Sequence, residues 1–175
     1  MKIVCTVSND LSFDQRMIKI CKALSNAGHE VLLAGRELTQ SIPIENKNFD
    51  QDRFRCFFNK GPLFYLELNI RHFYLLLRKK PELVYAVDDD TLLASTLAAK
   101  ILKAYLVFDS HEYFTEVPEL EGRNTVKSIW RFIEKRCIPA ADLCITVNQS
   151  IAKLYAEKYK KDFEVVRNLP DLADI

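Results

Sequence analysis

Three ionisable side chains, Asp109, His111 and Glu112, follow directly after a short apolar run at residues 105–108. An imidazole flanked by carboxylates can move protons or hydrogen-bond a sugar or a phosphate, because histidine titrates near neutral pH. The run itself predicts a buried strand. In open α/β sheets, ligands bind in the crevice outside the carboxyl ends of the strands, so these residues are candidates for a site. The alternative is a polar loop in which His111 hydrogen-bonds only backbone.

A second acidic group, Asp88, Asp89 and Asp90, follows another apolar run at residues 83–87. Hard divalent cations prefer carboxylate oxygens, so this group is a candidate metal site. The same residues stand where a strand gives way to a helix over residues 91–103. There Asp90 would be a good N-cap, and negative charge would suit the helix dipole. Because the sequence offers no second carboxylate cluster as a partner, we favour capping and solvation over a metal.

The elements that position these residues begin at the N-terminus. Residues 2–7 form a β-branched run that predicts a buried strand, and Ser-Asn-Asp at residues 8–10 predicts a polar turn after it. Asp14 is the expected N-cap of the next helix. Gly28 should end that helix, because glycine adopts the left-handed conformation without steric cost.

Apolar runs and helical patterns alternate along the rest of the chain. The predicted strands cover residues 2–7, 30–34, 53–58, 83–87, 105–108, 143–147 and 163–166, and the later helices cover residues 63–80, 91–103, 125–138 and 150–159. This alternation predicts an α/β fold: a Rossmann-like, doubly wound, mainly parallel sheet of about seven strands with helices on both faces and right-handed crossovers. We expect one domain over residues 1–166, with residues 167–175 starting a linker.

The composition narrows the classes of function. The 175 residues carry a net charge of +1, so nothing favours nucleic acid as a partner. The five cysteines are scattered and fit buried, reduced thiols. Without a signal-peptide pattern or a membrane-spanning stretch, a cytoplasmic protein is expected. The helices at residues 63–80 and 125–138 carry aromatic, leucine and basic residues that suit peripheral contact with the inner face of the membrane, although helices that cover a sheet look similar.

Four segments, in order and spanning almost the whole chain, resemble the family 4 glycosyltransferases of the GT-B fold. The segments are SFDQR at residues 12–16 with AGHEV at 27–31, FDSHEYFTEVP at 108–118, ADLCITV at 141–147 with SIA at 150–152, and VVRNLP at 165–170. The likeness is strongest to members that build bacterial surface polysaccharides. Enzymes of this family have two Rossmann-like domains, and they transfer a sugar from a nucleotide donor with retention of anomeric configuration and without a required metal or other cofactor.

The resemblance implies that this chain is the N-terminal, acceptor-binding domain. It implies a glycan or lipid-linked acceptor, and a nucleotide sugar that binds through a C-terminal domain missing from this sequence. His111 would face the cleft between the two domains as the catalytic residue, hydrogen-bonding the sugar or the acceptor rather than acting as a nucleophile. Asp109 and Glu112 would orient His111 or line the acceptor pocket.

The same resemblance assigns substrate-binding roles near the N-terminus. Asn9 and Asp10 would lie across the crevice from His111, and Asp14 and Arg16 would contact the acceptor or a donor phosphate. For Asp14 the N-cap role stays equally open. This first turn lacks the glycines that many family members have, which argues against close approach of its backbone to a phosphate.

Two further functions stay open. The chain could be a non-catalytic binding subunit of a split transferase, completed by a separate donor-domain chain, or a stand-alone flavodoxin-like module. It has only four glycines, with no Gly-x-Gly-x-x-Gly after the first strand and no P-loop, so we do not expect it to bind a dinucleotide or a triphosphate alone. A receiver domain would need more acidic residues after the first strand. By itself the chain is expected to be inactive as an enzyme.

Overall fold

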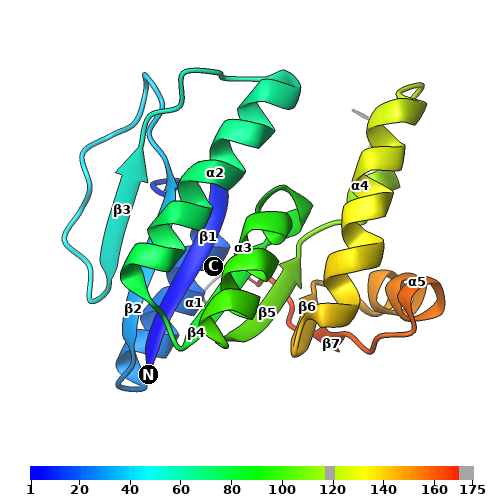
Figure 1. Ribbon diagram of the computed structural model, residues 1–175. Helices are drawn as coiled ribbons and strands as arrows, with labels where there is room; N and C mark the ends of the chain where they lie inside the picture. Colours follow the sequence, from blue (N-terminus) through cyan, green and yellow to red (C-terminus); the bar gives the residue numbers. More distant parts are fainter. Residues whose placement is uncertain (117–120, 170–175) are drawn as a thin grey trace.

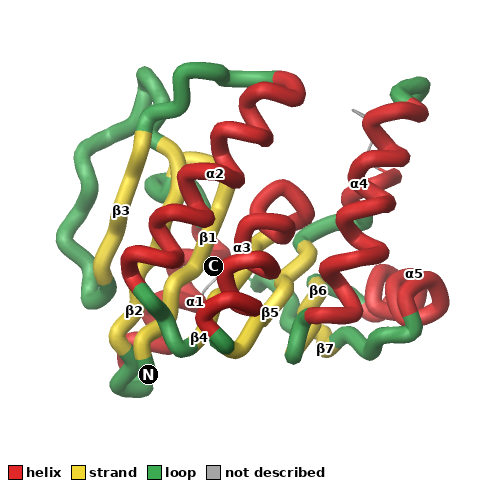
Figure 2. Tube along the Cα trace, viewed as in Figure 1, coloured by secondary structure: helices red, strands yellow, loops and turns green. Residues whose placement is uncertain are grey.

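Seven strands form one sheet in the computed structural model, which describes residues 1–116 and 121–169 (Figures 1 and 2). The strand order is β3-β2-β1-β4-β5-β6-β7, and every neighbouring pair is parallel. The predicted Rossmann-like α/β fold is therefore confirmed. Val117 and Pro118 of the sequence resemblance, and residues 170–175 of the expected linker, lie outside the described residues.

Strands and helices alternate almost throughout. The strands are β1 (Lys2–Asp10), β2 (Glu30–Arg36), β3 (Asp50–Phe54), β4 (Leu83–Val87), β5 (Tyr105–Ser110), β6 (Leu143–Thr146) and β7 (Glu164–Val165). The α-helices are α1 (Gln15–Asn26), α2 (Gly61–Lys79), α3 (Asp88–Leu102), α4 (Asn124–Cys137) and α5 (Gln149–Tyr159), with short 3₁₀ helices η1 (Phe114–Glu116) and η3 (Ile138–Ala140). The βαβ order explains the parallel pairing, because a crossover helix returns the chain to the start of the next strand.

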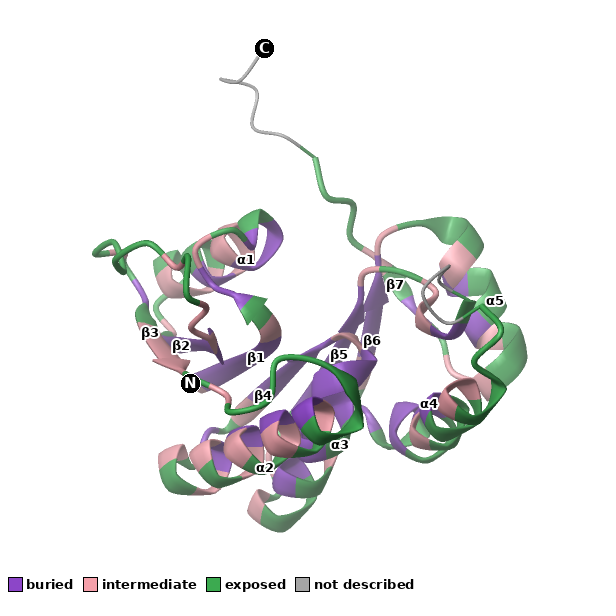
Figure 3. Ribbon diagram, turned by 90° about the horizontal axis from the view of Figure 1, so that it is seen from above, coloured by how far each residue is buried: buried purple, intermediate pink, exposed green. Residues whose placement is uncertain are grey.

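The core has two parts, one on each face of the sheet. Successive side chains of a strand point to opposite faces, so Ile3, Cys5 and Val7 of β1 belong to one apolar cluster while Val4 belongs to the other. The first cluster includes Met17 of α1, and the second includes apolar residues of α2, α3, α4 and α5. Figure 3 shows α1 on one side of the sheet and α2 and α3 on the other. Helices thus cover both faces.

The strand order reverses direction beside β1. From β1 the chain runs to β2 and β3 on one side, and it then returns through α2 to β4 on the other side of β1. At such a topological switch point the flanking connections diverge, and the crevice outside the carboxyl ends of the strands is open to ligands. The ends of β1, β4 and β5 therefore frame the expected position for a site.

Two strand predictions need correction. Residues 8–10 do not form a turn, because β1 continues to Asp10, with an irregularity in its pairing to β2 between Thr6 and Asp10. The third strand lies at Asp50–Phe54, rather than at residues 53–58. Among the described residues β3 pairs with β2 alone and is an edge strand, so it needs no apolar run, and the expected apolar residue Phe57 is instead 86% exposed.

Helix ends agree with the sequence at α1 and differ at α3. Asp14 caps α1 as predicted, since its side chain accepts a hydrogen bond from the Met17 amide, and Gly28 has a φ of +86°. Helix α3 begins at Asp88, so Asp90 is not its N-cap but lies in its first turn. Asp89 and Asp90 are buried, so the expected solvation was wrong for these two carboxylates.

Candidate functional site

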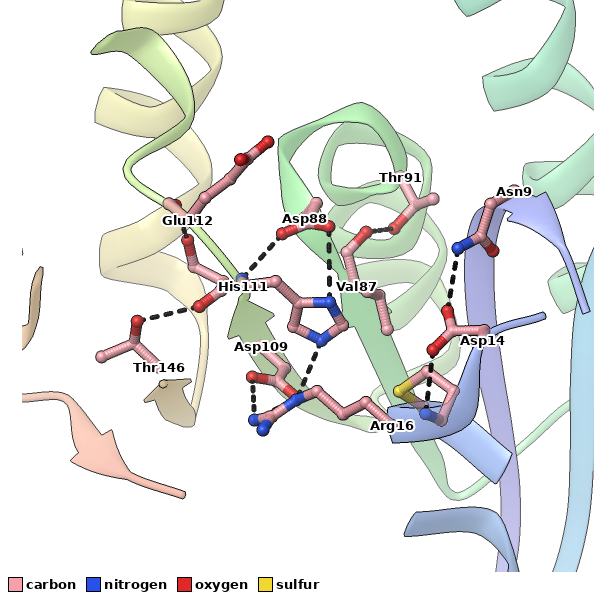
Figure 4. A network of polar contacts seen from close by, with 12 residues as sticks. Asn9, Asp14, Arg16, Val87, Asp88, Thr91, Asp109, His111, Glu112 and Thr146 are labelled. Atoms are coloured by element: carbon pink, nitrogen blue, oxygen red, sulfur yellow. Dashed lines mark hydrogen bonds and ion pairs between the residues drawn. The ribbon is translucent and has the colours of Figure 1, made fainter. Parts of the chain in front are cut away.

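The site is assembled from the carboxyl ends of three neighbouring strands. Val87 at the end of β4 pairs with Asp109 of β5, so Asp88 and His111, which follow them, emerge close together. Asn9, near the end of β1, comes from the strand on the other side of β4. Figure 4 shows these side chains with Asp14 and Arg16 from the start of α1. Residues far apart in the sequence therefore meet at the topological switch point.

His111 lies between two carboxylates. Its backbone N–H donates to Asp88 Oδ1 at 2.8 Å, and its Nδ1 lies 3.7 Å from Asp88 Oδ2. On the other side, its Nε2 lies 3.4 Å from Asp109 Oδ2, an ion-pair contact whose geometry is not that of a hydrogen bond (Figure 4). The two carboxylates fix the ring from both sides, which leaves the imidazole oriented and about a quarter exposed.

Asp88 achieves this contact through an unusual backbone. Its φ is +56°, in the left-handed region that non-glycine residues seldom adopt, although aspartate tolerates it better than most. This conformation turns the chain directly from β4 into α3, with no residue in between. The side chain is thereby placed where it can accept from the His111 amide.

Asp109 is fully buried and pairs with Arg16. The guanidinium donates from Nε to Asp109 Oδ2 at 3.1 Å and from Nη2 to Oδ1 at 2.9 Å, and the Tyr85 hydroxyl donates to the same carboxylate at 2.8 Å. Arg16 Nη1 donates to the Val166 carbonyl at 2.8 Å. All three guanidinium nitrogens are thus engaged within the chain, and the pair ties α1 to β5 and to the segment after β7.

The charges shift the pKa values of the site in a consistent way. Burial opposes ionisation of Asp109, but His111 and Arg16 outweigh it and hold the pKa of that carboxyl below its usual value. Burial likewise opposes the imidazolium, yet Asp109 and Asp88 raise the pKa of His111. Burial raises the pKa of Asp88 to about 6, although His111 acts in the opposite direction. The arrangement favours a positively charged His111 beside an ionised Asp109.

A pocket of about 330 Å³ opens beside this cluster. Its lining comes from the end of β1, the start of α1 and the ends of β5, β6 and β7: Asn9, Phe13, Asp14, Gln15, Arg16, His111, Val147 and Asn168. Four of the predicted site residues therefore line one cavity. Asp14 caps α1, which confirms the N-cap role, and its Oδ2 accepts a hydrogen bond from Asn9 Nδ2 at 3.0 Å; contact with a substrate stays a prediction.

The other predicted residues lie elsewhere. Asp109 does not line the pocket but holds Arg16 and His111, which do. Asp10 lies 3.6 Å from Arg53 and accepts hydrogen bonds from Ser41 and from the Ser12 amide, outside the pocket lining. The carboxylate of Glu112 points away from the imidazole (Figure 4), and this residue is exposed.

Sequence reasoning missed Asp88 as a site residue. It was grouped with Asp89 and Asp90, but the three side chains diverge: Asp88 meets His111, Asp89 lies against Glu134, and Asp90 lies against Ser8. Among residues 1–116 and 121–169, no three His, Cys, Asp or Glu side chains are grouped to hold a metal ion. The signal that would have singled out Asp88 is its position as the first residue after β4, next to the strand that carries Asp109.

Comparison with known proteins identifies the family. A model described as Glycosyltransferase Family 4 matches residues 15–174. The chain belongs to glycosyltransferase family 4. The match confirms the resemblance seen in the sequence, and it covers the pocket residues from Gln15 to Asn168. Comparison with curated proteins returned no significant match.

Solved structures show which folds the family 4 chain shares. It superimposes on sucrose-phosphate synthase from Thermosynechococcus elongatus with a TM-score of 0.67 and 14% identity, covering 99% of this chain and 49% of that one. The lipopolysaccharide outer core galactosyltransferase WaaB in its apo form gives 0.66 and 15%, covering 98% and 47%. Anabaena HepE in complex with UDP-glucose gives 0.62 and 16%, covering 99% and 45%. The chain thus spans about half the length of each.

Proposed function

We propose that this family 4 chain is the acceptor-binding half of a retaining glycosyltransferase. The complete protein would transfer a sugar from a nucleotide sugar to a glycan or lipid-linked acceptor, in the synthesis of surface polysaccharide. The observation that carries the proposal is the pocket in which His111, oriented by Asp88 and Asp109, lies beside Asn9, Asp14 and Arg16. Similar folds solved with UDP-glucose, UDP and thymidine diphosphate support a nucleotide-sugar donor.

In the proposed reaction, the bond between the sugar and the nucleotide diphosphate breaks. A bond forms between the anomeric carbon and an acceptor oxygen, which releases its proton, and the diphosphate leaves with the electrons of the broken bond. Negative charge therefore grows on the leaving oxygen. A histidine whose protonated form is favoured by neighbouring carboxylates is suited to donate a hydrogen bond to the sugar or to stabilise that charge. The same protonation makes His111 a poor nucleophile.

The decisive experiment replaces His111 in a protein that joins this chain to a donor-binding domain. His111→Ala should lower kcat by about a hundredfold or more, the loss typical of a positioned hydrogen-bonding or proton-transfer group. The matched control is His29→Ala, because His29 lies in the turn after α1 and outside the pocket. Unchanged turnover in the His111 variant, with the control also unchanged, would refute the assignment.

Three further measurements test the retaining mechanism and the proposed two-domain organisation of the complete protein. Proton NMR of the first product should show the anomeric configuration of the donor, and an inverted product would overturn the retaining mechanism. The isolated chain should show no turnover. An immunoblot of source cells should give a band near twice the 20.3 kDa mass of this chain. A band at that mass itself would point instead to a separate donor subunit.

We also propose peripheral contact with an anionic membrane at the cytoplasmic face. None of the helices in the described residues has the length and apolar character that a bilayer span requires. Both α2 and α4 pack against α3, and each exposes apolar side chains: Leu66, Ile70, Tyr74, Ile129 and Phe132. Basic residues occupy the last turn of both helices, where they would meet acidic headgroups.

Flotation tests this contact. The chain should rise with vesicles containing phosphatidylglycerol at low salt and stay behind with purely phosphatidylcholine vesicles. Phe132→Ser combined with Ile70→Ser should abolish flotation without changing the melting temperature greatly, because both side chains are exposed. No co-migration of the unaltered chain would remove the proposal.

A further inference from the structure

A second pocket, of about 430 Å³, lies at the carboxyl ends of β2 and β3. It is lined by the last residue of β2, the loop after it and the segment between β3 and α2: Arg36, Glu37, Leu38, Thr39, Gln40, Arg55, Cys56 and Asn59. Arg36 pairs with Asp10 across the β1–β2 ladder, and Asn9 lines the first pocket. The two pockets therefore lie on either side of the end of β1, along the same edge of the sheet.

Arg36 is held in place and has no close ion-pair partner among the described carboxylates. Its Nε donates to the Ser8 carbonyl at 2.7 Å, and its guanidinium carbon lies 4.3 Å from the centroid of the Phe64 ring. Its Nη1 is buried without a hydrogen-bond partner, and no described carboxylate lies close enough to form an ion pair with it, although burial raises the pKa of Asp90 and the charge of Arg36 opposes this at longer range. A guanidinium that is fixed on two sides and has no close ion-pair partner can receive an anion at its remaining nitrogen, Nη2.

The rest of the lining supports this reading of the pocket. The second guanidinium, that of Arg55, is neutralised, because its Nε and Nη2 donate to the two Glu37 carboxylate oxygens at 2.9 and 3.2 Å. Thr39, Gln40 and Asn59 add a hydroxyl and two amides, groups that pair with sugar hydroxyls. The pocket thus offers one cation and several neutral polar groups, which suits a polyhydroxylated ligand with one acidic substituent.

We propose that this pocket binds an acidic group, a carboxylate or a phosphate, on the sugar acceptor, and that Arg36 recognises it. The proposal rests on the acceptor-binding role assigned above, and it adds the chemical class of the acceptor. The Ser8 carbonyl and the Phe64 ring keep the planar fork of Arg36 from turning away, and its Nη2 would donate to an oxygen of the carboxylate or phosphate. An acceptor bound there would lie next to the cavity that contains His111.

The test is a titration of the ¹⁵N-labelled chain, followed by amide and arginine Nε chemical shifts at constant ionic strength. The probes are D-glucuronate, D-glucose 6-phosphate and neutral D-glucose. At least one acidic sugar should shift the signals of residues 36–40 and Asn59, at concentrations where glucose does not. Preference for glucuronate identifies a carboxylate, and preference for the phosphate ester identifies a phosphate. Equal shifts with glucose, or none with either acid, would overturn the proposal.

Substitutions distinguish specific recognition of the acidic sugar by Arg36 from nonspecific electrostatic attraction to the pocket. Arg36→Gln should weaken binding of the preferred acid at least tenfold, whereas the matched control, Arg55→Gln combined with Glu37→Gln, removes the neutralised pair together and should leave binding nearly unchanged. Arg36→Lys keeps the charge without the fork, so it should bind more weakly than the unaltered chain, and it serves if Arg36→Gln does not fold. Equal losses in the Arg36 and Arg55 variants would refute a specific role for Arg36.

The outcome of the titration does not depend on glycosyl transfer, because the titration contains no nucleotide-sugar donor. If His111→Ala keeps full turnover, the proposed role of His111 in transfer is refuted, but the binding of acidic sugars at Arg36 is not affected by that result. If the titration shows no binding of acidic sugars at Arg36 while His111→Ala loses turnover, only the proposal that the acceptor carries an acidic group is refuted.

Discussion

The buried ion pair between Arg16 and Asp109 gives the sharpest test of how the site is held together. Arg16 is 6% exposed and Asp109 is fully buried. Arg16→Met keeps the length and much of the apolar volume of the side chain, but it removes every hydrogen bond that Arg16 donates to Asp109 and to the Val166 carbonyl. The carboxylate is then left in the protein interior with the Tyr85 hydroxyl and, at 3.4 Å, the His111 ring.

The expected loss in free energy of unfolding follows from the burial of this ion pair. Removing one partner of a buried ion pair costs about 3–5 kcal/mol, because the remaining charge is desolvated and uncompensated. His111 still offers a second positive partner, so we expect a loss of about 3 kcal/mol, at the lower end of that range. This is a large share of the roughly 5–15 kcal/mol by which domains are stable. The urea midpoint should fall by about 1–2 M, for a slope of about 1.5–3 kcal/mol per M.

The assay is urea unfolding followed by the fluorescence of Trp130, which is the only tryptophan of the chain and is buried. The matched control is Arg55→Met. Arg55 forms the same two-pronged contact with a carboxylate, Glu37, but its side chain is 76% exposed. Water already solvates that pair, so its loss should barely move the midpoint. Similar changes in the two variants would refute the argument from burial.

Three further predictions concern stability. Gly35→Ala should destabilise the chain by about 1–3 kcal/mol through overpacking, because a Cβ there would lie 2.5 Å from a Leu11 methyl; a urea midpoint equal to that of the unaltered chain would contradict this. Asp14→Ala should cost about 0.5–2 kcal/mol in the same assay, as for other lost N-caps, with Asp14→Ser recovering part of the loss. Burial, then Glu134, raises the pKa of Asp89, so the folded chain retains a proton that the unfolded chain releases above about pH 4, and stability should fall as the pH rises. In Asp89→Asn, urea midpoints between pH 4 and 8 should decline less steeply, and parallel slopes would count against a proton retained by Asp89.

Local patterns were sufficient where one stretch of chain decides its own structure. The apolar runs at residues 83–87 and 105–108 are strands because they are buried on both faces of a parallel sheet. Asp14 caps α1 through a contact with an amide three residues away, and Gly28 has the positive φ expected of a helix end. In each case the responsible interaction spans only a few residues, so its signal is present in the sequence.

Local sequence patterns did not predict the edge strand β3 or the start of α3 correctly. Strand β3 lacks an apolar run because one of its sides pairs with β2 and the other is an edge, so the sequence 53–58 was preferred wrongly. Helix α3 begins at Asp88, earlier than predicted. Asp88 adopts a positive φ and contacts His111, which is 23 residues away. A contact of that kind outweighs the local preference for an N-cap at Asp90.

The sequence by itself determined the parallel α/β fold, the family, and His111 with its flanking acids as the candidate centre. Only the tertiary structure decided which acids hold His111. Arg16 and Asp109 are 93 residues apart and meet because β1, β4 and β5 are neighbours in the sheet, and Asp88 reaches His111 because Val87 pairs with Asp109. Glu112, one residue from His111, points away (Figure 4). Strand register sets these distances, and it depends on packing of the whole chain rather than on any single segment.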